Sequence, residues 1–132
     1  MEKTLVIIKP DGLVRGLIGE IISRFEKRAF SLVECKLISA DRSTVETHYE
    51  EHRGRSYFEE LVNYILEGPI FVMVIEGNRV IDTVRTMIGN KDPVIAQPGT
   101  IRGDYANSIT KNIIHASDSP TSAEREISIW FN

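Results

Sequence analysis

Short runs of apolar, often β-branched residues recur along the chain and predict its strands. Residues 4–8 form one such run, which ends at the turn-forming stretch Lys9-Pro-Asp-Gly12. Residues 70–76 are almost wholly apolar, which is typical of a strand in the middle of a sheet. Residues 32–40 instead alternate between apolar and charged side chains, which predicts a half-buried strand.

Other segments have apolar residues at helical spacing. Between residues 17 and 28 they recur every three or four positions with charged residues between them, which predicts an amphipathic helix covering the sheet. The sequences Ser43-Thr-Val-Glu46 and Ser56-Tyr-Phe-Glu59 match the capping-box pattern and predict two helix starts. Gly68-Pro69 is expected to end the second of these helices.

The region after the third strand is expected to hold a helix and then an irregular segment. Asn78 is predicted to cap the helix, which ends at Gly89-Asn90. Residues 91–104 contain two prolines and two glycines and have little periodicity. Because an irregular segment of this length in a compact domain is usually functional, we expect residues 91–104 to belong to a site.

The last part of the chain completes the predicted sheet. A short helical piece over residues 105–110 leads to a short strand near His115, and Pro120 suits the first position of a helix that runs to about Ile127. Two successive strand-helix-strand units predict an α+β, ferredoxin-like sandwich, in which helices cover one face of a four-stranded antiparallel sheet. Residues 1–132 are expected to form a single domain.

Composition narrows the classes of function. The chain is 42% hydrophobic, as soluble globular proteins are, and its 16 basic and 19 acidic residues give a formal net charge of −3. That charge provides no general field for attracting nucleic acid, so nucleic acid is not expected as the main substrate and any phosphate binding must be local. The sequence has neither a signal-peptide pattern nor an apolar run long enough for a membrane span, so we expect a cytoplasmic protein.

Three side chains are candidate metal ligands, and the sequence favours another reading for each. The single cysteine, Cys35, lacks partners and is expected to be a small buried side chain. His48 and His52 lie four residues apart on a predicted helix, but without further ligands they are expected to be solvated.

His115 is the residue with the clearest potential for chemistry. Imidazole is a good nucleophile near neutral pH, and a neighbouring acceptor can fix which of its nitrogens reacts. Glu126 is a candidate acceptor. A histidine without context is more often a satisfied residue at the edge of the core, but the residues around His115 favour the nucleophile.

Phosphate binding would have to come from side chains, because neither a Walker loop nor a dinucleotide-binding glycine pattern is present. Lys9 at a strand end, Arg85 at a helix end and Arg102 in the irregular segment could converge on a polyphosphate. Each of them taken alone is more commonly a solvated surface charge. In the pair Tyr57-Phe58, one ring should face the core while the other stacks on a base or covers the surface.

Six motifs in order resemble those of nucleoside diphosphate kinases, and the resemblance extends from Thr4 to Phe131. The motifs are Lys9-Pro-Asp-Gly12, His48-Tyr49, Pro98-Gly-Thr-Ile-Arg-Gly-Asp104, Asn112-Ile-Ile-His115, Ser117-Asp118-Ser119 and Ser122-Ala-Glu-Arg-Glu126-Ile-Ser-Ile-Trp-Phe131. The resemblance implies an ATP-binding phosphotransferase that exchanges the terminal phosphate between nucleoside triphosphates and diphosphates. It also implies a ping-pong route through a phosphohistidine, with Mg²⁺ on the nucleotide phosphates rather than on protein ligands.

The resemblance assigns roles residue by residue. His115 would take the γ-phosphate on Nδ1, Glu126 would orient the ring through the other nitrogen, and Ser117 would support the carboxylate. The side chains that would hold the transferring phosphate are Lys9, Tyr49, Arg85 and Arg102.

The resemblance also implies a nucleoside site. Lys9 and Asn112 would contact the ribose hydroxyls, and Tyr57 and Leu61 would border the base near Ile109. Stacking without hydrogen bonds to the base edge would accept purines and pyrimidines alike.

The chain departs from the usual family pattern at several positions. Lys91, a candidate substrate-binding residue, stands where threonine is common and either adds a phosphate contact or points to solvent, with solvent slightly favoured. Tyr57 replaces a more common phenylalanine, and Ala116 replaces a frequent glycine, which requires a negative φ. The sequence ends at Asn132, where many relatives continue with a tail that contacts other subunits, which weakens the prediction of the oligomer. A hexamer built from dimers is still favoured, with a tetramer or dimer close behind.

Two other functions remain open from the residues. A ferredoxin-like sheet can be a nucleic-acid or regulatory binding module, although the negative charge and the lack of aromatic RNA-binding motifs speak against this. A phosphohistidine carrier that accepts phosphate from a protein donor is the third candidate.

Overall fold

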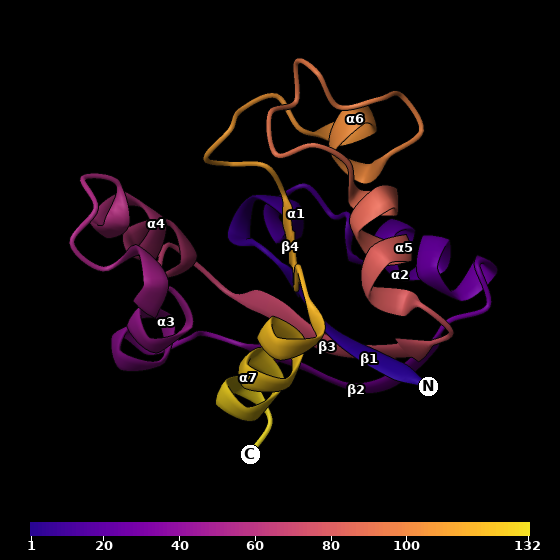
Figure 1. Ribbon diagram of the computed structural model, residues 1–132. Coiled ribbons are helices and arrows are strands. Elements are labelled where there is room, and N and C mark those ends of the chain that lie inside the picture. The colour runs from indigo at the N-terminus through magenta and orange to yellow at the C-terminus, as the bar shows by residue number, and fades with distance from the viewer.

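A four-stranded antiparallel sheet forms the centre of the protein, which we describe from a computed structural model of residues 1–132 (Figure 1). The strands are β1 (Glu2–Ile8), β2 (Ser31–Ile38), β3 (Ile70–Gly77) and β4 (Ile114–Ala116), and their order in the sheet is β2-β3-β1-β4. This confirms the predicted strands and the predicted ferredoxin-like α+β fold.

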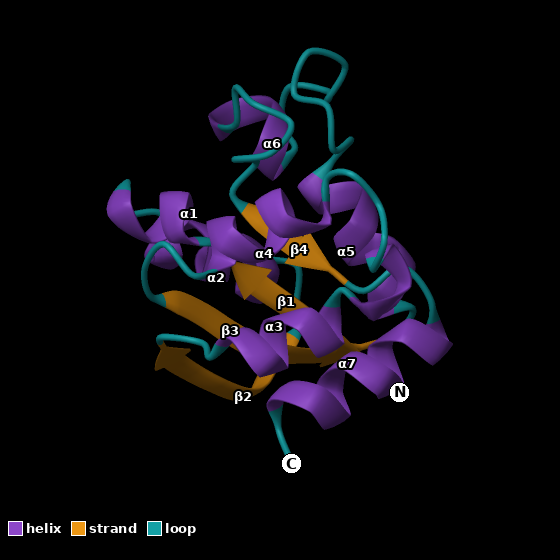
Figure 2. Cartoon of the chain, turned by 90° about the vertical axis from the view of Figure 1, so that its left-hand side faces the viewer, coloured by secondary structure: helices purple, strands orange, loops and turns teal.

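Helices cover both faces of the sheet, so the expectation that they cover one face is wrong. Helices α2 (Ile18–Lys27) and α5 (Val80–Ile88) pack on one face, and α3 (Arg42–His48), α4 (Phe58–Ile65) and α7 (Pro120–Trp130) pack mainly on the other. Figure 1 shows α3 and α4 on one side of the strands and α2 and α5 on the other, and in Figure 2 α3 and α7 lie in front of the strands.

The reason lies in the two central strands. In β1, Val6 and Ile8 belong to the core under α2 and α5, whereas Leu5 and Ile7 belong to the core under α3 and α4. All four side chains are buried. A strand that is apolar on both sides needs a cover on both faces, because each exposed apolar face would cost free energy in water.

The predicted helices over residues 17–28, 43 onward and 56 onward are present, but their starts differ from the capping-box prediction. Asp41 caps α3 by accepting a hydrogen bond from the Thr44 backbone amide (2.7 Å), so Ser43 lies inside the helix. Helix α4 begins without a side-chain cap. A carboxylate two residues before the serine is at least as good a cap, and the local sequence pattern could not rank the two.

Helix α5 also starts differently from the prediction. Arg79, not Asn78, precedes its first turn and has a left-handed backbone with φ of 51°. Gly89 ends α5 with φ of 86°, as predicted. In contrast, Ser119 and Pro120 begin α7 as the sequence indicated, with Ser119 accepting from the Ser122 amide (3.1 Å), and α7 continues to Trp130.

Three short helical segments complete the chain. Helix α1 (Pro10–Val14) occupies the stretch where a turn was predicted, and a 3-10 turn spans Glu50–His52. Helix α6 (Ile101–Tyr105) lies inside the segment expected to be irregular and is capped by Thr100. The short helix expected over residues 105–110 is absent.

Fewer apolar side chains of β2 are buried than the alternation of apolar and charged residues predicts. Val33 is 41% exposed, Leu37 is 60% exposed and Cys35 is also exposed, so the expectation that Cys35 is buried is wrong. A register shift between Leu32 and Glu34 places an extra residue in the strand, and β2 is an edge strand paired only with β3. The alternation therefore changes phase within the strand, and its outer side lies open.

No helix of the protein combines the length and the apolar character that crossing a lipid bilayer requires.

Candidate active site

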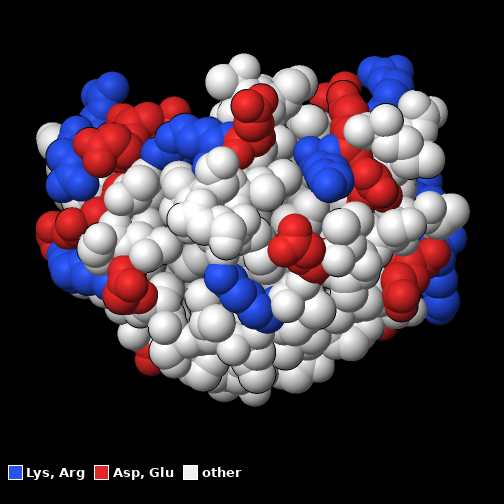
Figure 3. Space-filling model, turned by 90° about the horizontal axis from the view of Figure 1, so that it is seen from below, with Lys and Arg blue, Asp and Glu red and all other residues white.

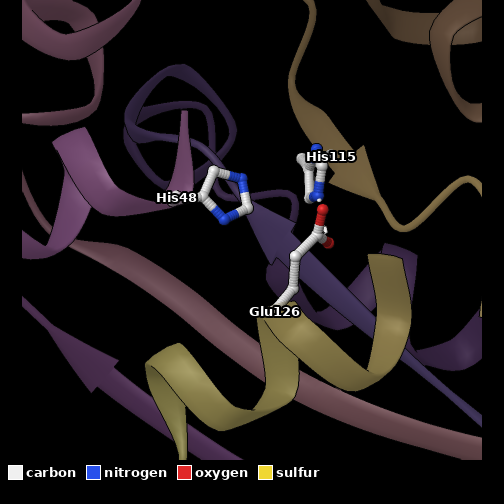
Figure 4. Close-up of side chains that lie close together, drawn as sticks. All are labelled: His48, His115 and Glu126. Atoms are coloured by element: carbon white, nitrogen blue, oxygen red, sulfur yellow. Dashed lines mark hydrogen bonds and ion pairs between the residues drawn. The ribbon is translucent and has the colours of Figure 1, made fainter. Parts of the chain in front are cut away.

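His115 lies on β4, paired with Ile7 of β1, and its side chain is 21% exposed. Its Nε2 is 2.9 Å from Oε1 of Glu126, and the two side chains point toward each other in Figure 4. Because a carboxylate accepts, this hydrogen bond holds the ring proton on Nε2 and leaves the lone pair of Nδ1 free. The geometry therefore prepares one defined nitrogen for nucleophilic attack.

Glu126 is held in place by Ser117. The Ser117 hydroxyl donates to the same Oε1 (2.7 Å), and the Leu5 backbone amide donates to the Ser117 Oγ (3.2 Å), which ties the carboxylate to β1. Burial by itself raises the pKa of Glu126, but the hydrogen bond from His115, together with that from Ser117, brings this pKa below its ordinary value. Glu126 is therefore ionised and can accept the hydrogen bond from the His115 ring.

The backbone before His115 is strained. Ile113 has φ of 78°, and a β-branched residue in the left-handed region is uncommon and costs about 1–3 kcal/mol. The Lys9 amide donates to the Ile113 carbonyl (2.7 Å). Ala116 does not have a positive φ, so alanine fits the position where glycine is frequent in relatives.

Two arginines hold the backbone on either side of the histidine. Arg102 donates from Nη2 to the Ile114 carbonyl (2.6 Å), and Arg85 donates from Nη1 to the Ala116 carbonyl (3.1 Å). Arg102 also reaches the Gly89 carbonyl at the end of α5 (3.0 Å). The strand that carries the nucleophile is therefore bracketed by cations from α5 and α6.

Lys9 adds a third cation, and it is buried. Its Nζ donates to Oδ1 of Asn112 (2.8 Å). Burial and the charge of Arg102 lower the pKa of Lys9 to about 7, while burial and the charge of Arg85 lower the pKa of Arg102 to about 10. Lys9, Arg85 and Arg102 form no ion pair with a carboxylate. Such unpaired positive charge favours an anionic ligand.

The remaining predicted residues lie around a second part of the site. Tyr49, at the end of α3, is buried, and burial raises the pKa of its hydroxyl, so the group stays a protonated donor. Tyr57 is 43% exposed and Ile109 is 58% exposed, whereas Phe58 faces the core as expected. The hydrogen bond between Thr110 and Glu60 (3.2 Å) brings the segment that contains Ile109 beside the start of α4, which also carries Leu61.

The side chain of Lys91 is exposed. Its backbone carbonyl accepts from the Asn112 side-chain amide (3.1 Å). This contact connects the segment after α5 to the strand of His115, so the position contributes to the site through its backbone.

Comparison with known proteins identifies the family. Residues 2–132 match the family model described as nucleoside diphosphate kinase. The chain belongs to the nucleoside diphosphate kinase family. It is thus an enzyme, a nucleoside diphosphate kinase that transfers phosphate between nucleotides.

Relatives and solved structures agree with this membership. A nucleoside diphosphate kinase of Saccharolobus solfataricus is 59% identical over 131 residues, which cover 99% of this chain and 95% of that protein. One of Brevibacillus brevis is 57% identical over 132 residues, which cover 100% of this chain and 90% of that protein. The apo crystal structure of the enzyme from Encephalitozoon cuniculi matches with a TM-score of 0.97 at 41% identity and covers 99% of this chain and 89% of that chain. A family protein from Babesia bovis also gives 0.97, at 42% identity, covering 100% of this chain and 89% of that chain.

The sequence prediction was also wrong for His48, which lies beside the site. It was expected to be solvated, but it is 5% exposed and its ring centroid lies 4.6 Å from that of His115. Helical spacing carried the missing signal, because His48 follows the core residue Val45 by three positions and so shares its buried face. His52, in contrast, is partly exposed and its Nδ1 is 2.9 Å from the Tyr57 hydroxyl.

Proposed function

We propose that this enzyme moves the γ-phosphate of a nucleoside triphosphate to a nucleoside diphosphate by a ping-pong route through phosphorylated His115. One observation carries the proposal: Glu126 engages Nε2 of the ring, so Nδ1 is free in a site bracketed by unpaired cations. Phosphoryl transfer depends largely on positioning and on neutralising charge, and this arrangement supplies both.

In the first half-reaction, the Nδ1 lone pair forms a bond to the γ-phosphorus while the bond from that phosphorus to the β,γ-bridging oxygen breaks. The nucleoside diphosphate leaves with the electron pair of the broken bond. The ring keeps its proton on Nε2 and donates a hydrogen bond from this N–H to Glu126, so the positive charge that develops on the ring faces a carboxylate. In the second half-reaction, a terminal oxygen of another nucleoside diphosphate attacks the phosphorus and the N–P bond breaks.

We assign the phosphate contacts to Lys9, Tyr49, Arg85 and Arg102. Lys9, Arg85 and Arg102 are cations and the Tyr49 hydroxyl is neutral, so none of these four side chains would hold a Mg²⁺ ion. These residues fit a Mg²⁺ ion that is held by the oxygens of the nucleotide phosphates. Such an ion supplies further neutralisation of the phosphate charge when bound.

For the nucleoside, we assign the ribose hydroxyls to Lys9 and Asn112, and the base to the surface between Tyr57, Leu61 and Ile109. The exposed Tyr57 ring and the exposed Ile109 side chain offer apolar contact without a set of donors and acceptors aimed at a base edge. This composition supports broad base specificity, because every base has a face that can stack.

Replacing Tyr57 tests this base site. In Tyr57→Leu we expect KM to rise by about 5- to 150-fold for every nucleotide tested, since stacking contributes about 1–3 kcal/mol per base. The kcat should change little, because the proposal places Tyr57 at the base and not at the transferring phosphate. Steady-state kinetics with ADP, GDP, CDP and UDP measure this, and Tyr57→Phe, which keeps the ring, is the matched control. A loss confined to one base would contradict a stacking site.

We also propose that the protein is cytoplasmic and works as a homo-oligomer, with a hexamer favoured over a tetramer or dimer. Support for self-association comes from β2, where Val33 and Leu37 are exposed on an edge strand. Seen from below, the side on which β2 lies in Figure 1, the surface has a broad uncharged area (Figure 3). Sedimentation at several protein concentrations measures the assembly state, and a monomer at all of them would contradict this proposal.

The ping-pong route itself is tested by separating the two half-reactions. Incubation with γ-³²P-labelled ATP, followed by removal of the nucleotide, should leave labelled protein whose label is released by acid, as expected of an N–P bond. Addition of GDP should then convert the label to GTP. Label transfer that occurs only when both nucleotides are present would contradict a phosphoenzyme, and labelling only by a protein donor would favour a phosphocarrier.

A further inference from the structure

His48 packs directly against the proposed nucleophile, and the mechanism above gives it no part. Its ring and that of His115 are 4.6 Å apart between centroids and inclined by 79°, an edge-to-face arrangement. The two histidines come from different elements, the end of α3 and the middle of β4. A side chain so close to the ring of His115 limits the orientations that this ring can adopt.

Trp130 determines the state of His48. The indole Nε1 donates a hydrogen bond to Nδ1 of His48 (3.1 Å), and both side chains are buried. An indole N–H is only a donor, so Nδ1 must be the acceptor and the ring proton must lie on Nε2. In Figure 4 one ring nitrogen of His48 is directed towards α7 and the other away from it.

Helix α7 therefore fixes both imidazoles from one side. Glu126 accepts a hydrogen bond from His115, and Trp130, one helical turn later, donates a hydrogen bond to His48. The first contact stabilises positive charge on its ring, whereas the second opposes protonation of its ring, because an added proton on Nδ1 would face the indole N–H.

We propose that His48 is a positioning residue for phosphoryl transfer: held by Trp130 as a neutral ring with its proton on Nε2, it braces His115 without placing charge beside it. This proposal rests on the proposed function, in which His115 gains positive charge as it bonds to phosphorus.

The charge state of His48 affects phosphoryl transfer because several charged and titratable groups face its ring. His115 faces it from β4, Glu126 and Arg125 from α7, Lys9 from the end of β1, and Tyr49 follows it in the chain. Burial and then the charge of His115 lower the pKa of His48 to about 3, while Glu126 acts in the opposite direction. A charged His48 would compete for Glu126 and repel the charge that develops on His115.

Three side chains here, His48, His115 and Glu126, resemble a metal site, but the hydrogen bond from Trp130 to His48 argues against metal binding. His48, His115 and Glu126 offer ligand atoms within 4.8 Å of one another. A histidine that ligates a metal through Nε2 normally donates its Nδ1 proton to an acceptor. Trp130 requires the other tautomer, so His48 can serve as a neutral brace more readily than as a ligand.

A pair of isosteric variants tests the proposal. Trp130→Phe keeps the aromatic bulk and removes the N–H, so Nδ1 becomes free to take a proton and the pKa of His48 should rise from about 3, while burial and the charge of His115 still hold it below its ordinary value. We expect a new acidic limb in the pH profile of kcat/KM, with activity within about threefold of wild type at pH 8. In the double variant His48→Phe/Trp130→Phe, which has a neutral flat ring in place of His48, this limb should disappear.

Removing the His48 side chain gives a second test. His48→Ala should lower kcat by about 10- to 100-fold with little change in KM, because misplacement of a nucleophile affects the chemical step more than binding. A His48→Ala variant that is folded and keeps wild-type kcat would overturn the proposal. So would a Trp130→Phe profile identical to wild type, or an acidic limb that persists in the double variant.

A measurement without turnover keeps this proposal separate from the phosphohistidine route. In ¹⁵N-histidine-labelled protein, NMR should show His48 with the proton on Nε2 and without protonation down to pH 5, and Trp130→Phe should lose this fixed state. A wild-type His48 that titrates above pH 5 would overturn the proposal even if His115 is phosphorylated. Failure to label His115 would instead overturn the proposed function and leave the state of His48 as measured.

Discussion

His115→Ala should reduce phosphate exchange by about 10⁴-fold or more in kcat, which corresponds to about 5 kcal/mol of transition-state free energy. The loss is expected to be this large because removal of Nδ1 removes the atom that forms the covalent intermediate, and no neighbouring side chain can replace it. In His48, the other imidazole in the site, Nδ1 accepts a hydrogen bond from Trp130 and Nε2 carries the ring proton, so the ring has no free lone pair.

The experiment needs a variant that separates loss of chemistry from loss of structure. His115 is only partly buried, and its ring contributes few core contacts, so His115→Ala should unfold close to the wild-type temperature and bind nucleotide with a similar Kd. Glu126→Gln is the matched comparison, since it keeps the shape but weakens the acceptor for Nε2, and we expect a smaller loss of about 10- to 100-fold. Exchange by His115→Ala at the wild-type rate would refute the proposed route.

Lys9→Met should have two opposite effects, a loss of activity and a gain in stability. Activity should fall by about 10²- to 10³-fold in kcat/KM, because a buried cation is worth most where it meets phosphate charge away from water. The melting temperature of the nucleotide-free protein should rise at neutral pH. Lys9 is buried with Asn112 as its hydrogen-bond partner, beside the charge of Arg102, so the empty protein holds this cation at a cost.

The pH dependence of this gain has a defined sign. The folded-state pKa of Lys9 is about 7, below its unfolded value, so the cost of burying the charge is fully present below pH 7. As pH rises from about 7 to about 10, the unfolded chain binds more protons than the folded protein, and the wild type gains stability relative to Lys9→Met. Melting curves at pH 6, 8 and 9.5 should therefore converge. A constant difference across this range would show that the charge of Lys9 is not its cause.

Nucleotide binding should convert Lys9 from its neutral form to its charged form. A polyphosphate beside Nζ favours the charged form, so binding at pH 8 should take up protons from the buffer. Titration calorimetry in buffers of different ionisation enthalpy measures this uptake, and Lys9→Met should lose most of it. If Lys9→Met takes up as many protons as the wild type when nucleotide binds, another group must be the one that is protonated.

The fold was predictable to the extent that hydrophobic pattern determined it. Strands β1 and β3 were found because their apolar runs are short and bounded by turns, and the same runs already indicated burial on both sides, although one covered face was expected. The phase of β2 could not be read from the sequence, because the register shift after Leu32 depends on pairing with β3. Helix starts were wrong where two capping residues competed within a few positions, as Asp41 and Ser43 did.

The candidate site was predictable as a set of residues but not as an arrangement. Lys9, Arg85 and Arg102 are far apart in the chain, and only the resemblance to a known family brought them together with His115. The spacing of residues in the sequence could not show that Arg102 and Arg85 hold the backbone on either side of the nucleophile. It also could not show that Ile113, just before this segment, has a left-handed backbone. The state of His48 also depends on Trp130, which lies 82 residues later in the chain.

The most direct measurement is ³¹P NMR of the phosphoenzyme formed with ATP, after removal of nucleotide. The hydrogen bond from Nε2 to Glu126 requires phosphorus on Nδ1 of a single histidine, so one N–P resonance should appear at the shift of Nδ1-phosphohistidine and vanish on addition of GDP and in His115→Ala. Phosphorus on Nε2 of His115, or a resonance that remains in His115→Ala, would contradict the account.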